Sequence, residues 1–324
     1  MKIGDVEIQG RVVLGPMAGV TSEAYRCFMK PFGVALSFTE MVSDCGLDYG
    51  NARTYEYLPS EKTDRPLGLQ LFGFSVENTA KAVSIAEKNG NYDVLDINLG
   101  CPVPKVVKTG AGSSWLRRPE ELEAYMKAVV EASSKPVTAK IRLGWDEESI
   151  NVFDVALRLQ RAGVQGITVH CRTRVQGYAG EADYRAIAGL KEQLSIPLIV
   201  SGDIFTAQKA KEALDITHAD AVMIARGGLG HPFLATQINT YLETGELLDN
   251  PPPEAQAEYA LDFATRLIEQ EGEATAIKQL KGLIPHFFAG FPGYKKIRTE
   301  IASKVMTQSQ LFRVLEGIKK RKGC

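Results

Sequence analysis

The sequence has 324 residues, of which 44% are hydrophobic and 24% charged, with a formal net charge of −1, as in an ordinary soluble globular protein. It contains no run of about 18 apolar residues, which excludes a membrane span, and its start lacks the apolar stretch of a signal peptide. Five scattered cysteines without a C-x-x-C pair, and four histidines without a paired metal motif, argue against a disulfide framework or a metal site and favour a reducing cytosol.

The charge is unevenly distributed along the chain. Residues Ala276 to Cys324 contain 11 Lys and Arg against 2 Glu, a net charge of roughly +9, and the remainder is therefore acidic. This asymmetry indicates a basic segment with an anionic partner. A solvated basic helical face is the alternative.

A pattern repeats along most of the chain: a short run rich in Val, Ile and Leu, a polar or glycine-bearing loop, and a stretch with helical periodicity. A small hairpin is expected over Gly4 to Arg11. The expected strands are Val12–Leu14, Leu36–Thr39, Leu67–Leu71, Val94–Ile97, Val137–Ile141, Ile167–His170, Leu198–Ser201 and Ala221–Ile224. The expected helices include Ser22–Phe32, Val76–Asn89, Pro119–Ser133, Ile150–Ala162, Tyr184–Gln193 and Ala207–Leu214. Eight such units predict a (β/α)8 TIM barrel. A doubly wound sheet would show fewer strands and an early G-x-G-x-x-G motif.

The character of the sequence changes after Thr244. Residues Asp249 to Pro253 end in three consecutive prolines, which block helix and sheet and predict a linker. Helical periodicity follows over Glu254–Gln270, Ala274–Leu283, Tyr294–Ser303 and Ser309–Lys320. We therefore expect a barrel domain over residues 1–243 and a small all-helical domain over residues 244–324.

The stretch from Asp96 to Lys105 presents a cysteine just beyond a predicted buried strand. Gly100 permits a tight turn, and the two prolines after Cys101 stiffen the loop. The carboxyl ends of parallel strands are where α/β proteins carry out chemistry. Cys101 is therefore a candidate catalytic residue, with a cysteine capping a buried loop as the alternative.

Polar residues recur at the ends of the other predicted strands. Lys140 is expected to point into the barrel mouth, where an unpaired buried lysine would be costly for structure alone. His170 taken alone equally fits a satisfied core histidine, and Glu40 equally fits a partner of Arg142 or Lys140. The recurrence of such residues at one end of the barrel favours a functional site.

The last two strands are followed by the glycine-rich turns Ser201-Gly202-Asp203 and Ala225-Arg226-Gly227-Gly228, which expose backbone N–H groups to an anion. Plain turn glycines beside a surface arginine are the alternative to a phosphate site. A phosphate site with a lysine and a histidine in a barrel mouth fits flavin mononucleotide (FMN). The predicted FMN-binding residues are Pro16, Met17, Ala18, Gln70, Lys140, His170, Gly202, Asp203, Ala225, Arg226 and Gly227.

Together these motifs resemble the tRNA-dihydrouridine synthases. The resemblance runs through Gly15 to Thr21, Gln70 to Gly73, Asn98 to Pro102, Lys140 to Trp145, His170 to Arg174, Gln176 to Tyr178, Gly180, Ala182 to Tyr184, Gly202 to Ile204 and Ala225 to Gly227. In the tail, His286 to Gly293 and Arg298 are similar to the family's helical RNA-binding domain. One departure is Ser201, where the family usually has Asn.

The resemblance implies FMN as cofactor, NADPH as reductant and uridines in tRNA as substrate. We also expect a cytoplasmic, monomeric enzyme. Cys101 would be the general acid that protonates uracil C5 after hydride reaches C6. The implied substrate-binding residues are Asn98, Arg142, Arg172 and Tyr178 near the base, and Lys295, Lys296 and Arg298 on the tRNA.

Three other functions remain open at this point. Another FMN barrel acting on a free pyrimidine, such as a dihydroorotate dehydrogenase, also uses a loop cysteine, but a small substrate does not explain the basic tail. An aldolase would use Lys140 as a Schiff base. A non-catalytic RNA-binding protein would need no cysteine at position 101.

Overall fold

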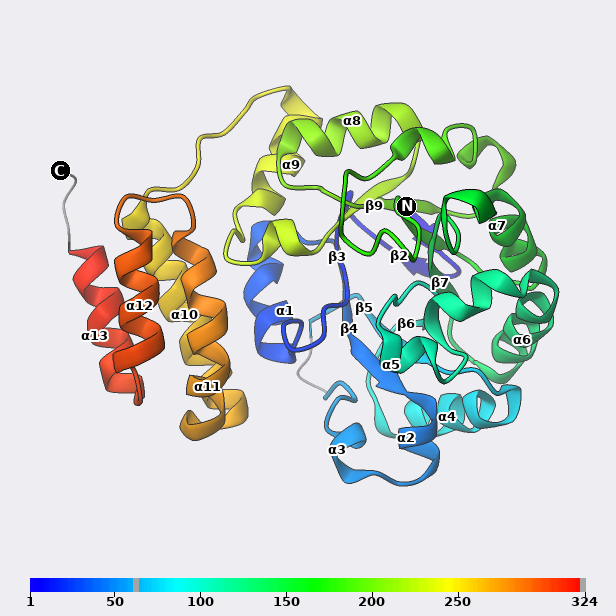
Figure 1. The fold of residues 1–324 in the computed structure, drawn as a ribbon, viewed down its shortest axis with the longest axis horizontal. Coiled ribbons are helices and arrows are strands. Elements are labelled where there is room, and N and C mark those ends of the chain that lie inside the picture. Colours follow the sequence, from blue (N-terminus) through cyan, green and yellow to red (C-terminus); the bar gives the residue numbers. More distant parts are fainter. Residues whose placement is uncertain (61–63, 321–324) are drawn as a thin grey trace.

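The computed structural model describes residues 1–60 and 64–320, and its centre is a closed barrel of eight parallel strands (Figure 1). Neighbouring strands follow one another around the barrel in the order β10-β3-β4-β5-β6-β7-β8-β9. The predicted (β/α)8 barrel and the C-terminal helices are both present. A hairpin of β1 (Lys2–Ile3) and β2 (Val6–Glu7) precedes the barrel, earlier than expected, because the chain turns at Gly4 and not beyond it.

All eight expected strands form. They are β3 (Val12–Leu14), β4 (Leu36–Ser43), β5 (Leu67–Phe72), β6 (Val94–Asn98), β7 (Val137–Arg142), β8 (Ile167–His170), β9 (Leu198–Ser201) and β10 (Ala221–Ile224). Strand β4 runs four residues further than expected, and its pairing with β5 shifts register between Phe38 and Met41. This irregularity lets the strand continue past the polar Glu40.

Most expected helices also form around the barrel. They are α1 (Glu23–Met29), α4 (Val76–Asn89), α6 (Pro119–Ala132), α7 (Val152–Arg161) and α8 (Ala207–Thr217), with α2 (Asp44–Asp48), α3 (Ala52–Tyr55), α5 (Pro104–Val107) and α9 (Leu234–Thr244) in addition. The expected helix Tyr184–Gln193 is wrong. Two short 3-10 turns, Tyr184–Ile187 and Lys191–Gln193, stand there, since Gly189 between them has a φ of +83°.

The interior of the barrel has an apolar floor and a polar top. Val13, Phe38, Val94 and Ile199 belong to one buried cluster, and Ile3 of the hairpin joins it. A Cβ on Gly68 would lie 2.3 Å from the Phe38 ring, so the glycine makes room for that ring. Above this layer the inward positions become polar, which is the arrangement that a site at the carboxyl ends of the strands requires.

The chain after α9 forms α10 (Pro253–Glu271), α11 (Glu273–Leu283), α12 (Tyr294–Lys304) and α13 (Gln308–Lys319), which lie together beside the barrel (Figure 1). Helix α10 packs against α1 through aromatic rings. The Phe263 ring centroid is 5.3 Å from that of Tyr25 and 5.5 Å from that of Phe28, and Tyr259 is 5.0 Å from Phe32. This apolar seam fixes the helices against the barrel wall. The domain boundary expected after residue 243 falls one residue before the end of α9.

Candidate functional site

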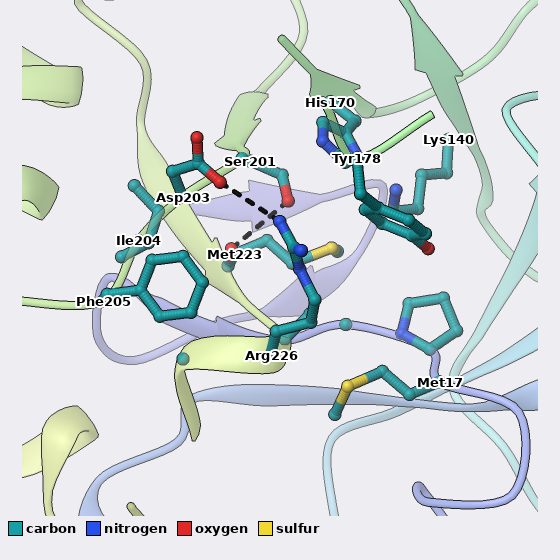
Figure 2. Close-up of a pocket in the computed structure, with 15 residues that line it drawn as sticks. Met17, Lys140, His170, Tyr178, Ser201, Asp203, Ile204, Phe205, Met223 and Arg226 are labelled. Atoms are coloured by element: carbon teal, nitrogen blue, oxygen red, sulfur yellow. Dashed lines mark hydrogen bonds and ion pairs between the residues drawn. The ribbon is translucent and has the colours of Figure 1, made fainter. Parts of the chain in front are cut away.

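A cavity opens at the carboxyl ends of the barrel strands (Figure 2). Its water-accessible space measures about 90 Å³, and the cavity is partly open to solvent. Loops after β3, β9 and β10 and the ends of β7 and β8 contribute its walls. It is lined by Gly15, Pro16, Met17, Lys140, His170, Tyr178, Ser201, Gly202, Asp203, Ile204, Phe205, Met223, Ala225, Arg226 and Gly227.

Two loops in this cavity present backbone N–H groups. Gly202 and Asp203 have φ values of +119° and +51°, a conformation that turns the chain sharply after β9. A Cβ on Gly227 would lie 2.0 Å from the carbonyl oxygen of Ile204, so only glycine allows the two loops to approach. Within residues 1–60 and 64–320, the N–H groups of Gly202, Asp203 and Gly227 donate to no other residue. They form a cradle for an anion.

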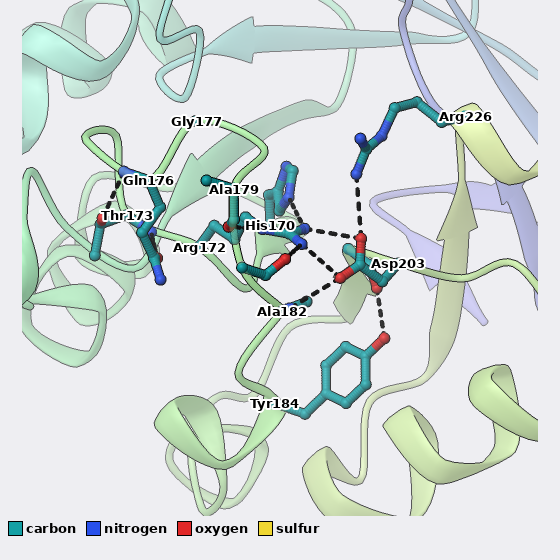
Figure 3. A network of polar contacts seen from close by, with 12 residues as sticks. His170, Arg172, Thr173, Gln176, Gly177, Ala179, Ala182, Tyr184, Asp203 and Arg226 are labelled. Carbon is teal, nitrogen blue, oxygen red and sulfur yellow. Dashed lines mark hydrogen bonds and ion pairs between the residues drawn. The ribbon is translucent and has the colours of Figure 1, made fainter.

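Arg172, Asp203 and Arg226 form an ion-pair network at one wall of the cavity (Figure 3). Arg172 is 1% exposed, and its Nη1 and Nη2 donate to Asp203 Oδ1 at 2.9 Å and Oδ2 at 2.6 Å. Arg226 Nη2 donates to Asp203 Oδ1 at 3.1 Å. Burial opposes ionisation of Asp203, but the hydrogen bonds from Arg172 and the Ala182 N–H lower its pKa on balance. The buried Arg172 therefore anchors the loops after β8 and β9.

Arg226 differs from Arg172 in exposure and surroundings. Its guanidinium carbon lies 4.5 Å from the ring centroid of Tyr178 and 5.6 Å from that of Phe205. Both rings are about half exposed. A partly exposed guanidinium between two aromatic faces at the cavity edge is available to a bound anion.

Lys140 and His170 lie deeper in the mouth. Burial first, and then the nearby charge of Arg142, lowers the pKa of Lys140 to about 8. Burial together with the charges of Lys140, Arg142, Arg172 and Arg226 lowers the pKa of His170 far below its ordinary value, so its imidazole is neutral at physiological pH. The site therefore offers one titratable cation and one neutral imidazole to a ligand.

The Cys101 loop is fixed by side-chain hydrogen bonds to its backbone. Asn98 Oδ1 accepts from the N–H of Cys101 at 2.9 Å and from that of Gly100 at 3.2 Å. Ser113 Oγ donates to the Cys101 carbonyl at 2.9 Å. Burial raises the pKa of the Cys101 thiol, and the nearby charges of Arg142 and Lys140 lower it by a smaller amount. The cysteine is thus held in one backbone geometry and protonated at neutral pH.

Arg142 joins this loop to the one after β8. Its Nε donates to the Gly100 carbonyl at 2.8 Å, and its Nη1 donates to the carbonyls of Thr173 at 2.8 Å and Gly177 at 2.9 Å. The side chain is 2% exposed. Arg142 therefore holds the two loops together through their backbone carbonyls.

The structure brings most of the predicted residues together. Those that line the cavity are Pro16, Met17, Lys140, His170, Tyr178, Gly202, Asp203, Ala225, Arg226 and Gly227. Gln70, Asn98, Arg142 and Arg172 are buried behind or beside it. Ala18 lies at a different cleft, with Gly19 and Glu40. Lys295, Lys296 and Arg298 are exposed on α12 of the C-terminal helices.

Sequence reasoning missed several residues of the site. Phe205 and Met223 line the cavity, and Phe205 stacks on Arg226, but neither belongs to a polar strand-end pattern. Asp96 was also missed, although a carboxylate between Leu95 and Ile97 in a buried strand is itself a signal, because an isolated charge there is costly. Thr138, its partner on β7, had no signal of its own.

Two further observations concern metals and membranes. Across the described residues, no group of three or more His, Cys, Asp or Glu side chains is arranged to hold a metal ion. None of the helices in residues 1–60 and 64–320 has the length and hydropathy needed to cross a membrane.

The fold and the site define a (β/α)8-barrel protein with an anion cradle and a cysteine loop at the barrel mouth, extended by a helical C-terminal segment. The model of the family described as dihydrouridine synthase (Dus) matches residues 13–322, and the chain belongs to this family.

Individual relatives agree with this assignment. The chain is 38% identical over 303 residues to a probable tRNA-dihydrouridine synthase 1 of Synechocystis sp., covering 93% of this chain and 84% of that one. It is 33% identical over 324 residues to tRNA-dihydrouridine synthase B of Pseudomonas aeruginosa, covering 99% and 96%. Among solved structures, histamine dehydrogenase from Rhizobium sp. 4-9 has a similar fold, with a TM-score of 0.60 at 11% identity over 82% of this chain and 50% of that one.

Proposed function

We propose that the protein is a flavin-dependent tRNA-dihydrouridine synthase, which reduces uridine to 5,6-dihydrouridine in tRNA with Cys101 as the proton donor. The names of the relatives support the reaction and the tRNA substrate. The single observation that carries the proposal is an anion cradle after β9 and β10 together with a protonated cysteine on a fixed loop after β6, at the same end of the parallel barrel.

The residues present fit FMN. The N–H groups of Gly202 and Gly227, which have no acceptor among the described residues, and the partly exposed Arg226 suit a dianionic phosphate. Lys140 and His170 lie where they would hold the flavin ring, above Pro16 and Met17. When bound and reduced, with NADPH as the proposed reductant, FMN supplies the hydride for C6 of uracil, and the charge of Lys140 would stabilise the reduced ring.

Cys101 holds the proton that the reaction needs. The C5=C6 bond of uracil is conjugated to the C4 carbonyl, so addition of hydride at C6 turns that carbonyl into an enolate, which takes a proton at C5. Because burial raises the pKa of Cys101, the thiol is protonated at neutral pH and available to donate. Asn98 and Ser113 hold the backbone on both sides of the thiol, which limits its movement relative to the base.

The C-terminal helices are proposed to bind the tRNA. Lys295, Lys296 and Arg298 are exposed on α12, while Ile297 and Ile301 of the same helix are buried, so the charged side chains face solvent. Arg321 and Lys322, which contribute to the basic tail, lie outside the described residues. The target uridine must leave its stack to enter the barrel mouth. We further propose that the enzyme acts in the cytoplasm as a monomer.

The proposal is tested with purified protein, NADPH and a tRNA transcript that lacks dihydrouridine. We expect a flavin absorption spectrum, release of FMN on denaturation and dihydrouridine in the nucleosides of the digested tRNA. A colourless protein that takes up no FMN would overturn the cofactor assignment. Reduction or oxidation of a free pyrimidine, with unchanged tRNA, would instead favour the dihydroorotate dehydrogenase-like alternative.

A further inference from the structure

Asp96 begins a chain of hydrogen bonds that crosses the top of the barrel interior. It lies on β6, is 1% exposed, and its Oδ2 accepts from Gln70 Nε2 of β5 at 2.7 Å. Gln70 Oε1 accepts from Asn98 Nδ2 at 2.9 Å. Asn98 Oδ1 then accepts from the backbone N–H of Cys101 at 2.9 Å. A buried carboxylate is thus connected to the backbone of the cysteine through two amide side chains.

Each link of this chain has only one workable direction. An ionised carboxylate only accepts hydrogen bonds, so the Gln70 NH2 group must face Asp96 and its oxygen must face Asn98. The Asn98 NH2 group then faces Gln70, and its oxygen is left for the N–H groups of Gly100 and Cys101. A reversed Asn98 amide would place N–H groups against N–H groups. The polarity that Asp96 sets is the one that the Cys101 loop needs.

The surroundings make this polarity depend on Asp96. Gln70 is fully buried, so its NH2 group has no access to water if the carboxylate is removed. Burial raises the pKa of Asp96, and the hydrogen bonds from Gln70 and Thr138 and the charge of Lys140 limit this rise to a value of about 6. The carboxylate is therefore ionised at neutral pH. The second carboxylate oxygen, Oδ1, accepts from Thr138 Oγ1 at 2.7 Å and lies on a separate branch.

We propose that Asp96 is a positioning residue for Cys101: it fixes the orientation of the Gln70 and Asn98 amides and through them the backbone of the cysteine loop. This inference rests on the proposed function for its catalytic meaning. Its physical content, the placement of the Cys101 thiol, can be measured without turnover. Neither the apolar floor of the barrel nor the anion cradle contains a residue of this chain of contacts.

The Asp96 carboxylate accepts one hydrogen bond from Gln70 and one from Thr138, and the test uses variants that remove one or the other. Asp96→Leu is close in size and removes the acceptor for Gln70. Asp96→Asn keeps an acceptor for Gln70, because the asparagine can turn its oxygen toward Gln70 and its NH2 group toward Thr138 Oγ1. The Thr138 hydroxyl can then donate to the Leu95 carbonyl, which is 3.5 Å away. Thr138→Val is the matched control, since it removes the other hydrogen bond to the same carboxylate and leaves the Gln70 branch intact.

The first readout is the alkylation rate of Cys101 by iodoacetamide near pH 7.5, followed by peptide mass spectrometry with Cys45 as an internal standard. The thiolate is the reactive form, and the buried thiol has a raised pKa. Release of the loop exposes the thiol, so Asp96→Leu is expected to alkylate at least about threefold faster at Cys101, with Cys45 unchanged. Asp96→Asn and Thr138→Val are expected to stay within about twofold of the unaltered protein.

The second readout is single-turnover formation of dihydrouridine at saturating tRNA. In Asp96→Leu we expect the Cys101 thiol to be displaced by up to about 1 Å, which lowers the rate of the chemical step by up to about 100-fold. The affinity for tRNA is expected to be unchanged. If Asp96→Leu does not fold, Gln70→Met breaks the next link and is expected to give the same two results.

A folded Asp96→Leu protein with unaltered Cys101 alkylation and turnover would overturn the proposal. So would a Thr138→Val protein that changes as much as Asp96→Leu, because the effect would then come from loss of packing. If the unaltered protein makes no dihydrouridine, the proposed function fails, while the alkylation rates still decide whether Asp96 positions Cys101.

Discussion

The guanidinium of Arg172 and the carboxylate of Asp203 meet through two hydrogen bonds, Nη1 to Oδ1 at 2.9 Å and Nη2 to Oδ2 at 2.6 Å, beside the anion cradle. Arg172 also donates to the carbonyls of Ala179 and Gly180. The guanidinium of Arg172 therefore ties the loop after β8 to Asp203, which has a left-handed backbone conformation in the loop after β9.

Replacement of Asp203 by Ala is expected to lower the free energy of unfolding by about 3 kcal/mol, because it leaves the guanidinium of Arg172 buried without its counter-charge. Urea denaturation followed by circular dichroism measures this loss. Asp262→Ala is the matched control: its partner Arg266 is about 40% exposed on α10, and little change is expected there. Equal losses in the two variants would contradict a special role for the buried pair.

Lys140→Met is expected to stabilise the flavin-free protein while weakening FMN binding by about tenfold or more, because it removes a buried charge that a reduced flavin would need. The pKa of Lys140 is lowered to about 8, whereas an unfolded lysine titrates near about 10.4. Between these values the unfolded chain binds more protons, so the stability of the unaltered protein rises with pH.

The stabilisation by Lys140→Met should therefore be largest below pH 8 and shrink as pH rises above it. Thermal unfolding across pH 6 to 10, with and without FMN, tests both parts. A stabilisation that does not vary with pH, or an unaltered FMN affinity, would show that Lys140 is neither charged in the folded protein nor part of the flavin site.

Neutralising Lys295, Lys296 and Arg298 together is expected to weaken tRNA binding, because phosphate contacts release counterions. Each contact contributes about 0.7–0.9 to the slope of log affinity against log salt, so the slope should fall by about 2. Filter binding at several salt concentrations measures it, and the flavin spectrum should be unchanged. Lys209→Gln with Lys211→Gln on α8 is the control, since both lysines are paired with neighbouring carboxylates. An unaltered slope in the triple variant would place RNA recognition elsewhere.

The barrel was predictable from the sequence because buried parallel strands are short apolar runs whose ends are marked by glycines and polar residues. The eight strand positions, the dominant barrel helices and the clustering of Lys140, His170 and Arg226 all follow from that rule. The family resemblance is confirmed by the match over residues 13–322.

The features of the fold and the site that the sequence did not predict depend on contacts between distant segments. The register shift in β4 and the replacement of the Tyr184–Gln193 helix by two turns are set by packing and by the conformation of Gly189, which local periodicity does not reveal. Likewise, the hydrogen bonds that join the Gln70 amide to Asp96 and Asn98 could not be read from the sequence. Side-chain partners on two neighbouring strands are not encoded in the pattern of either strand alone.

The most direct test of the account is a pair of half-reactions with Cys101→Ala. We expect NADPH to bleach the flavin of this variant at the rate of the unaltered protein, since Cys101 does not line the cavity that is proposed to hold the cofactor. Reoxidation by tRNA should then be slower by about 100-fold or more, because the enolate lacks its proton donor. Stopped-flow absorbance measures both steps. Reoxidation by tRNA at the unaltered rate, with dihydrouridine formed, would contradict the assignment of Cys101 as the acid.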